Sequence, residues 1–233
     1  MTDTPASSAT DLQQLLLLLQ HGDGQFPSGA FGFSWGLEGM LADGMVRSDG
    51  LQAAIGSLLA ERWAPFDRLV VRRAWQAGGD ADRLAALDAE VEACLLVPAE
   101  RAGSARAGAA LLASHTRLGT AGASALQATI RGGGMKGHRP VVEGALWRGL
   151  GLAEHEALLL SGYGFTAALC TAAVRLGRLG ALGQQAILTV LLPLLVDLAA
   201  APVEEDAVLE SFNPLAEIAM LRQPGRSASL FAT

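Results

Sequence analysis

Apolar residues recur at helical spacing along most of the chain. Two stripes show this spacing most clearly: Leu51, Ile55, Leu58 and Leu59, and Leu84, Leu87, Val91 and Leu95. Positions three, four, seven and eight residues apart share one face of an α-helix, and no comparable run alternates as a strand would. The pattern therefore predicts an all-α fold, a multi-helix bundle of roughly ten helices.

Glycine, proline and capping residues predict where these helices begin and end. We expect helices over 11–20 and 31–41, followed by one that is capped by Ser48 and one that begins at Pro65 and ends at Gly78. The next helix is capped by Asp80 and ends at Pro98, and another spans 99–130 with a break near Gly119. A helix that begins at Pro140 and three more over 154–178, 182–200 and 204–221 complete the set. The chain shows no internal repeat or long linker. We therefore expect a disordered head over 1–10, one helical domain over 11–223 and a flexible tail over 224–233.

Two segments are apolar enough to be weighed as membrane spans. Residues 157–174 contain no charged residue, and residues 186–203 contain only Asp197. Glycine and hydroxyl residues dilute the first segment, while Pro193 and the Asp197 carboxylate interrupt the second. We expect two buried central helices, with an integral membrane protein as the alternative.

Composition and charge narrow the function. The net charge of −6 and a pI near 5.2 argue against nucleic acid as a partner, because phosphate binding needs a basic face. Cys94 and Cys170 lie in apolar helical patterns with no disulfide or ligand spacing, which predicts two core thiols in a reducing compartment. No basic segment precedes the leucine run at 15–19, so a cytoplasmic location is expected.

The search for catalytic chemistry finds no site. The four histidines are separated from one another and from the cysteines along the chain, and no metal-binding, phosphate-binding or nucleophile motif is present. His138 is the exception to consider, because it follows a glycine-rich loop from which a side chain could reach a partner. We expect no catalytic residue, no bound metal and no cofactor.

The stretch from Phe26 to Glu38 is the most unusual part of the sequence. It reads FPSGAFGFSWGLE and combines glycine, proline and three phenylalanines at a turn into a helix. Two interpretations are open from the residues alone. The stretch could form a tightly packed corner, or it could present aromatic anchors to a protein partner.

Four segments of this chain resemble the urease accessory protein UreF family. The segment from Pro27 to Glu38 is similar to the family's PxGxFxxSxGLE signature, and His138 to Gly144 resembles its HxPVVxG segment. Residues 100–108 and 173–180 are similar to two further family elements in the same order. The closing RLF of the family reads Ser229-Leu230-Phe231 here.

This resemblance implies an all-α homodimer that bridges the UreD (UreH) scaffold and the GTPase UreG while nickel is delivered to apo-urease. Nickel would be handled by the complex and not stably bound by this chain, with no membrane and no nucleic acid involved. The alternative role is a regulator of GTP turnover on UreG. The matching positions are the candidate partner-binding residues: Pro27, Gly29, Phe31, Ser34, Gly36, Leu37, Glu38, His138, Pro140, Gly144, Arg175, Arg226, Leu230 and Phe231.

Overall fold

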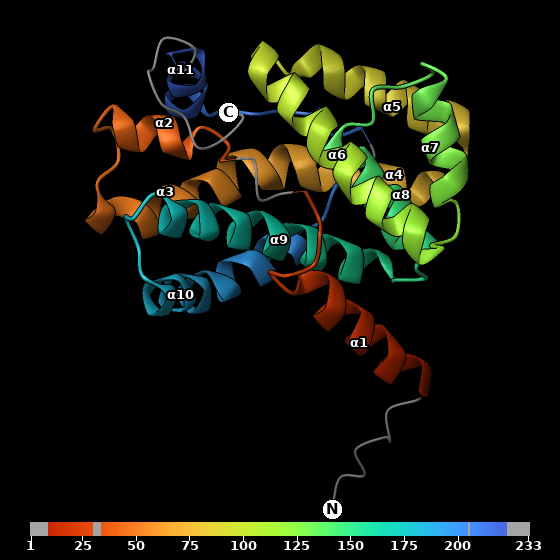
Figure 1. The fold of residues 1–233 in the computed structure, drawn as a ribbon, viewed down its shortest axis with the longest axis horizontal. Coiled ribbons are helices and arrows are strands. Elements are labelled where there is room, and N and C mark those ends of the chain that lie inside the picture. Colours follow the sequence, from red (N-terminus) through yellow and green to blue (C-terminus); the bar gives the residue numbers. More distant parts are fainter. Residues whose placement is uncertain (1–8, 30–33, 205, 223–233) are drawn as a thin grey trace, which may run out of the picture.

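The structure is a computed structural model that describes residues 9–29, 34–204 and 206–222. Every regular element in these ranges is a helix, which confirms the predicted all-α fold (Figure 1). The α-helices are α1 (Ala9–Gly22), α2 (Leu37–Ala42), α3 (Leu51–Leu58), α4 (Arg68–Ala77), α5 (Ala81–Cys94), α6 (Pro98–Leu118), α7 (Ala123–Arg131), α8 (Arg139–Gly149), α9 (Glu154–Arg175), α10 (Ala181–Ala200) and α11 (Pro214–Arg222). A 3-10 turn, η2 (Ser48–Gly50), and a π-helix, η3 (Leu59–Asp67), flank α3.

Several predicted helix ends are confirmed in atomic detail. The Asp80 carboxylate accepts hydrogen bonds from the amides of Asp82 and Arg83, both at 3.1 Å, and so caps α5. Gly78 ends α4 and Gly119 ends α6, each in the left-handed region with φ of 61° and 74°. This backbone conformation costs glycine little, which explains why both helices stop there.

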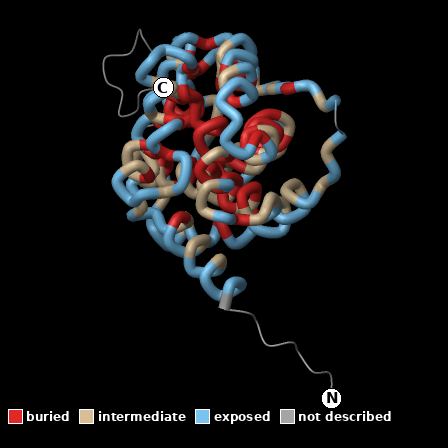
Figure 2. The backbone as a smooth tube through the Cα atoms, turned by 90° about the vertical axis from the view of Figure 1, so that its right-hand side faces the viewer, coloured by how far each residue is buried: buried red, intermediate tan, exposed pale blue. Residues whose placement is uncertain are grey.

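Two hydrophobic clusters form the interior. One lies mainly among α4, α5, α6 and α8, and the other among α2, α3, η3 and α10. Helix α9 belongs to both, since its N-terminal half supplies Leu158 to the first cluster and its C-terminal half supplies Leu169 to the second. The expected central role of this helix is confirmed, and Figure 2 shows the buried positions gathered inside the helical shell.

Helices α4 and α8 pack closely because a glycine lies at their contact. A Cβ atom on Gly144 would lie 2.3 Å from the Val71 carbonyl oxygen and 2.6 Å from the Cβ of Ala74. No side chain fits in that space. The candidate residue Gly144 therefore lies between two helices of the first cluster.

The prediction that Pro65 opens a helix is wrong. The chain stays helical from Ser48 to Ala77, and Pro65 lies inside η3. Proline cannot donate an amide hydrogen to the preceding turn, and the wider turns of a π-helix accommodate this loss. The Glu61 carbonyl, which lies in the turn before Pro65, accepts a hydrogen bond of 3.3 Å from the backbone amide of Phe212. A distant part of the chain therefore supplies the donor for this carbonyl.

The prediction that the last helix begins at Glu204 is also wrong, since α11 begins at Pro214. Residues 201–204 and 206–213 instead form a connector without a regular helix, and it crosses α4. Arg68 donates to the carbonyls of Leu198 and Ala201, and Arg73 donates to the carbonyl of Ala207. These guanidinium groups satisfy carbonyls at and beyond the C-terminus of α10 that have no partner in a helix.

Helix α2 is shorter than the helix predicted over 31–41. It begins at Leu37, after a turn in which Trp35 and Gly36 have positive φ values of 45° and 80°. A helix cannot pass through two such residues, so the turn sets its start. Residues 30–33, and with them Phe31, lie outside the described residues.

Helices α9 and α10 are both long and apolar enough to cross a membrane by length and composition. In the most apolar 18-residue stretch of each helix, 61% of the α9 stretch is buried but only 22% of the α10 stretch. Helix α10 is therefore buried along one side, whereas the sequence predicted burial on all sides. Helix α1 projects from the body of the protein (Figure 1). Cys170 is buried as predicted, whereas Cys94 is exposed.

Candidate functional site

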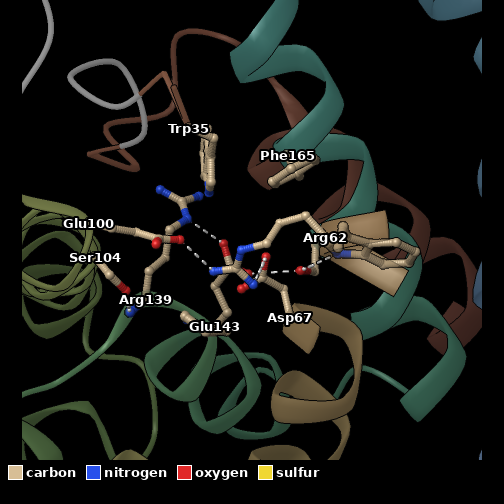
Figure 3. A pocket seen from close by; sticks show the side chains of 11 residues that line it. Trp35, Arg62, Asp67, Glu100, Ser104, Arg139, Glu143 and Phe165 are labelled. Atoms are coloured by element: carbon tan, nitrogen blue, oxygen red, sulfur yellow. Dashed lines mark hydrogen bonds and ion pairs between the residues drawn. The ribbon is translucent and has the colours of Figure 1, made fainter. Parts of the chain in front are cut away.

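Three of the four family-like segments meet at one small cavity (Figure 3). Trp35 comes from the N-terminal stretch, Glu100 and Ser104 from α6, and Arg139 and Glu143 from α8. η3 and α9 close the remaining sides: Arg62, Trp63, Asp67, Ser161 and Phe165. The volume is about 20 Å³, which is room for one water molecule.

Arg62 is the centre of the first half of a buried ionic network. Its Nη1 atom lies 3.2 Å from Oδ2 of Asp67, and its Nη2 atom lies 3.1 Å from Oε1 of Glu100. The guanidinium also lies over the ring of Phe66, 4.2 Å from its centre. All three charged side chains are at least nine-tenths buried, so these ion pairs are screened little by water.

Arg139 organises the second half. Its Nε atom donates to Glu143 at 2.8 Å, and its Nη1 atom donates to the Ser28 carbonyl at 3.2 Å. The second Glu143 oxygen accepts from the Ser161 hydroxyl at 2.9 Å, and Trp63 donates to Ser161 at 3.2 Å. A continuous chain of hydrogen bonds thus runs from the loop before residue 30 to the interior of η3.

The network contains more carboxylates than guanidinium groups. Burial disfavours the charged form of Asp67 and raises its pKa to about 6. The positive charge of Arg62 lowers this pKa, but the negative charges of Glu143 and Glu100 oppose that effect. For Arg62 burial disfavours the charged form, but Asp67 and Glu100 outweigh burial and raise its pKa. Burial and the charge of Glu100 also raise the pKa of Glu217, so this residue of α11 lies within the field of the network.

The described part of the N-terminal stretch forms a packed corner. Ser34, Leu37 and Glu38 are buried, and the Trp35 ring meets Phe165 edge to face with 4.8 Å between centres. A Cβ on Gly36 would lie 2.7 Å from the Ala216 carbonyl, so α11 sits directly on this corner. The packing interpretation therefore holds for residues 34–38.

Pro27 and Gly29, which precede the undescribed residues 30–33, both contact α6. Pro27 is exposed, and its carbonyl accepts a hydrogen bond from the Ser114 hydroxyl at 2.8 Å. Gly29 has a φ of 73° and lies so close to α6 that a Cβ would meet the Cβ of Ala110 at 2.5 Å. Both contacts fix the loop against α6.

The expectation that His138 reaches out from a mobile glycine loop is wrong. Its side chain is fully buried, with Nε2 2.8 Å from a Glu92 carboxylate oxygen. The Asp88 carboxylate accepts hydrogen bonds from the amides of Lys136, Gly137 and His138, at 2.5, 3.1 and 2.8 Å. Asp88 lies on α5, so no local signal in the sequence could reveal that it fixes this loop.

The other candidate residues divide between the interior and the undescribed tail. Pro140 lies in the first turn of α8 and is buried, while Arg175 is half-buried in the last turn of α9. Arg226, Leu230 and Phe231 lie outside the described residues. Among the described candidates, Pro140 lines the cavity of the ionic network, whereas Gly29, Gly36 and Gly144 lie at close contacts between chain segments.

Two histidines that are far apart in the sequence meet in the fold. The rings of His21 and His115 have centres 5.1 Å apart, with Phe26 and Trp147 beside them. Burial lowers the pKa of both groups, and the pKa of His115 falls to about 4. In the part of the chain that is described, no group of three or more metal-binding side chains occurs.

The buried His115 makes stability depend on pH. The unfolded chain takes up the proton near pH 6.5, whereas the folded chain takes it up only near pH 4. Stability is therefore lost as the pH falls through this window, by about 3 kcal/mol for a shift of this size. We expect urea denaturation at pH 7 and pH 4.5 to show this loss relative to a His115→Phe variant. Equal pH dependence of the two proteins would contradict the assignment.

Several helices carry large apolar side chains that the described structure leaves exposed, and on α10 these are Leu182, Val190, Leu192 and Val196. On α11 they are Leu215, Ile218 and Leu221, with Val208 and Phe212 on the connector before it. On α1 they are Leu12, Leu15, Leu16 and Leu19, which lie at positions i, i+3, i+4 and i+7 of one face. Contiguous exposed apolar patches of this kind mark interaction sites.

The fold and site define an all-α bundle with a buried ionic centre and exposed apolar helix faces. Residues 45–192 match the family model named UreF, so the chain belongs to the UreF family. The protein named urease accessory protein UreF from Trichodesmium erythraeum is 28% identical over 96% of this chain and 98% of its own length. The proteins of the same name from Cereibacter sphaeroides strain KD131 and Haemophilus influenzae strain PittGG are 32% and 31% identical, over 94% and 81% of this chain and 98% and 80% of their own lengths.

Proposed function

We propose that this chain is a cytoplasmic urease accessory protein that acts in urease maturation and not as a catalyst. It bridges the UreD (UreH) scaffold and the GTPase UreG during nickel insertion into apo-urease. Membership of the UreF family and matches to accessory proteins over nearly their whole length support this role. Nickel is the cargo of the complex, and this chain supplies binding surfaces.

The observation that carries the proposal is the two-faced helix α11. Its inner face presents Ala216 to Gly36 and Ala219 to Gly39 of α2, and a Cβ on Gly39 would lie 2.9 Å from the Cβ of Ala219. Its outer face presents Leu215, Ile218 and Leu221, which are 55%, 39% and 61% exposed. A helix held by small residues on one side, with large apolar residues free on the other, suits docking of a partner. We assign this outer face to the scaffold protein.

Charge on the outer face of α11 should weaken scaffold binding. We expect the double substitution Ile218→Asp and Leu221→Asp to weaken co-purification with UreD at least about tenfold, because each lost apolar anchor costs roughly 1–2 kcal/mol of binding. Leu96→Asp is the matched control, since Leu96 is 76% exposed on a different surface between α5 and α6. Undiminished UreD binding by the double variant would show that this face is not the docking surface.

A second copy of the chain is the proposed partner for α1. The leucine stripe of α1 lies beside hollows of about 510 and 280 Å³ along α9. Leu159 and Tyr163 line the first hollow, and Gly164 and Ala168 line the second. A projecting stripe next to an apolar groove allows two copies to contact each other reciprocally, as a two-fold homodimer requires.

The dimer proposal predicts a change in mass. We expect Leu16→Asp to convert the protein to monomers at micromolar concentration, because the leucine is 65% exposed at the centre of the stripe. Leu118→Asp, at an exposed position at the end of α6, is the control and should leave the dimer intact. Sedimentation velocity measures both. A dimer that persists in the Leu16 variant would exclude this surface.

A further inference from the structure

The aromatic cluster at the base of α1 contains three ring nitrogens without a hydrogen-bond partner in the protein. They are Nε2 of His21, Nε2 of His115 and Nε1 of Trp147. The three side chains are only 9%, 0% and 4% exposed. Trp147 meets both histidine rings edge to face, with centres 5.5 and 5.4 Å apart. Buried polar groups are almost always paired, so three orphans in one place call for a ligand.

The hydrogen-bonding role of the nitrogens can be derived from their neighbours. Nδ1 of His21 lies 2.8 Å from the Leu17 carbonyl, which can only accept. Nδ1 therefore carries the hydrogen, and Nε2 of His21 is an acceptor. Nδ1 of His115 lies 2.9 Å from the Thr120 hydroxyl, which can accept or donate, so Nε2 of His115 can be an acceptor or a donor. Trp147 Nε1 can only donate.

An acceptor on His21, a donor on Trp147 and a third nitrogen that can take either role select the chemistry of the ligand. A metal ion or an ammonium ion could engage both histidines, but it would leave the indole N–H of Trp147 unpaired. Metal–nitrogen bonds of about 2.1 Å would also hold the two nitrogens within about 4.2 Å of each other. A water molecule offers two donors and two acceptor positions, and hydrogen bonds of about 2.9 Å allow a wider spacing. A water molecule can therefore pair with all three nitrogens.

We propose that this cluster binds one water molecule, which donates to Nε2 of His21 and His115 and accepts from Nε1 of Trp147. Three hydrogen bonds are the usual number for a buried water in a protein. His21 and Trp147 also line the hollow of about 280 Å³ along α9, which gives the water a route from the surface. The site belongs to three elements, because His21 lies in the last turn of α1, His115 lies in the last turn of α6 and Trp147 lies on α8. The water therefore links the projecting helix α1 to the body.

A high-resolution crystal structure of the full chain at pH 7 tests the proposal, together with Trp147→Phe. We expect an ordered water within hydrogen-bond distance of all three nitrogens in the unsubstituted protein. In Trp147→Phe the water should lose a partner, and amide exchange in the last turn of α1 should rise about tenfold while exchange in α9 stays unchanged. Absence of density between the three rings would overturn the proposal.

Nuclear magnetic resonance of the histidine ring nitrogens provides a second test that needs no crystal. We expect both Nε2 signals to report hydrogen-bonded acceptors, and we expect them to stay unchanged when equimolar Ni²⁺ or Zn²⁺ is added. A metal-induced shift of both signals that a chelator reverses would assign the site to a cation and overturn the proposal. An Nε2 hydrogen on His21 would also overturn it, because the nitrogen would then be a donor.

Discussion

Replacing Arg62 with methionine is expected to lower the free energy of unfolding by about 3–5 kcal/mol. The substitution keeps much of the side-chain volume but leaves the Asp67 and Glu100 carboxylates buried without their cation. Three carboxylates already share this region with two guanidinium groups, so no neighbouring cation can replace Arg62. Urea denaturation followed by circular dichroism at pH 7 measures the loss.

The control for this prediction is Arg47→Met. Arg47 pairs with Asp49 at 3.6 Å, but both side chains are about four-fifths exposed. Exposed pairs contribute little, so the control should change stability by less than about 1 kcal/mol. Equal effects of the two substitutions would contradict the account of the network. A smaller loss for Arg62→Met at pH 5 than at pH 7 is also expected, because Asp67 can then take up a proton.

Replacing Gly144 with alanine is expected to cost about 2–3 kcal/mol. The new methyl group would lie 2.3 Å from the Val71 carbonyl oxygen, so α8 would have to move away from α4. The gain in helix propensity from glycine to alanine, up to about 1 kcal/mol, cannot offset this overlap. Thermal and urea denaturation measure the change.

Gly50→Ala is the matched control for Gly144. Gly50 has a φ of −93°, and no atom lies within 4 Å of a Cβ built on it. Alanine at this position should be neutral or stabilising by up to about 1 kcal/mol, because it restricts the unfolded chain. A destabilisation at Gly50 as large as that at Gly144 would show that close packing of α4 and α8 is not the cause.

The helical fold was predictable because the signals that set it are local. The Asp80 cap and the glycines at 78 and 119 act within one turn of the helices they end. Two of the errors in helix boundaries have distant causes. Pro65 stays inside a helix because the segment widens to a π-helix and packs against the connector. The last helix starts later than predicted because arginines of α4 hydrogen-bond to carbonyls of that connector.

The candidate site was predictable only in part. The family-like segments were found, and the structure brings three of them to one cavity. Apart from local pairs such as Arg139 with Glu143, four residues apart, what those residues contact could not be predicted, because the partners lie far along the chain. Asp88 fixes the loop before His138 from 48 to 50 residues away, and His115 meets His21 across 94 positions. Charge and spacing in a sequence carry no record of such pairings.

The family-like motifs take on a different meaning in the fold. Glu100, Arg139 and Glu143 build a buried network, and Gly36 and Gly144 permit close helix contacts. These residues hold the bundle together and set the position of α11. The surfaces proposed for partners lie elsewhere, on the outer faces of α1 and α11, where the sequence shows only ordinary leucine and isoleucine.

The most direct test of the central claim is reconstitution of a complex from purified UreD, UreG and apo-urease with and without this chain. The account predicts that UreG joins UreD and apo-urease only when the chain is present, and that nickel enters urease only in that mixture. The Ile218→Asp and Leu221→Asp double variant should fail to recruit UreG. Recruitment of UreG and nickel loading of urease to the same extent without the chain would contradict the account.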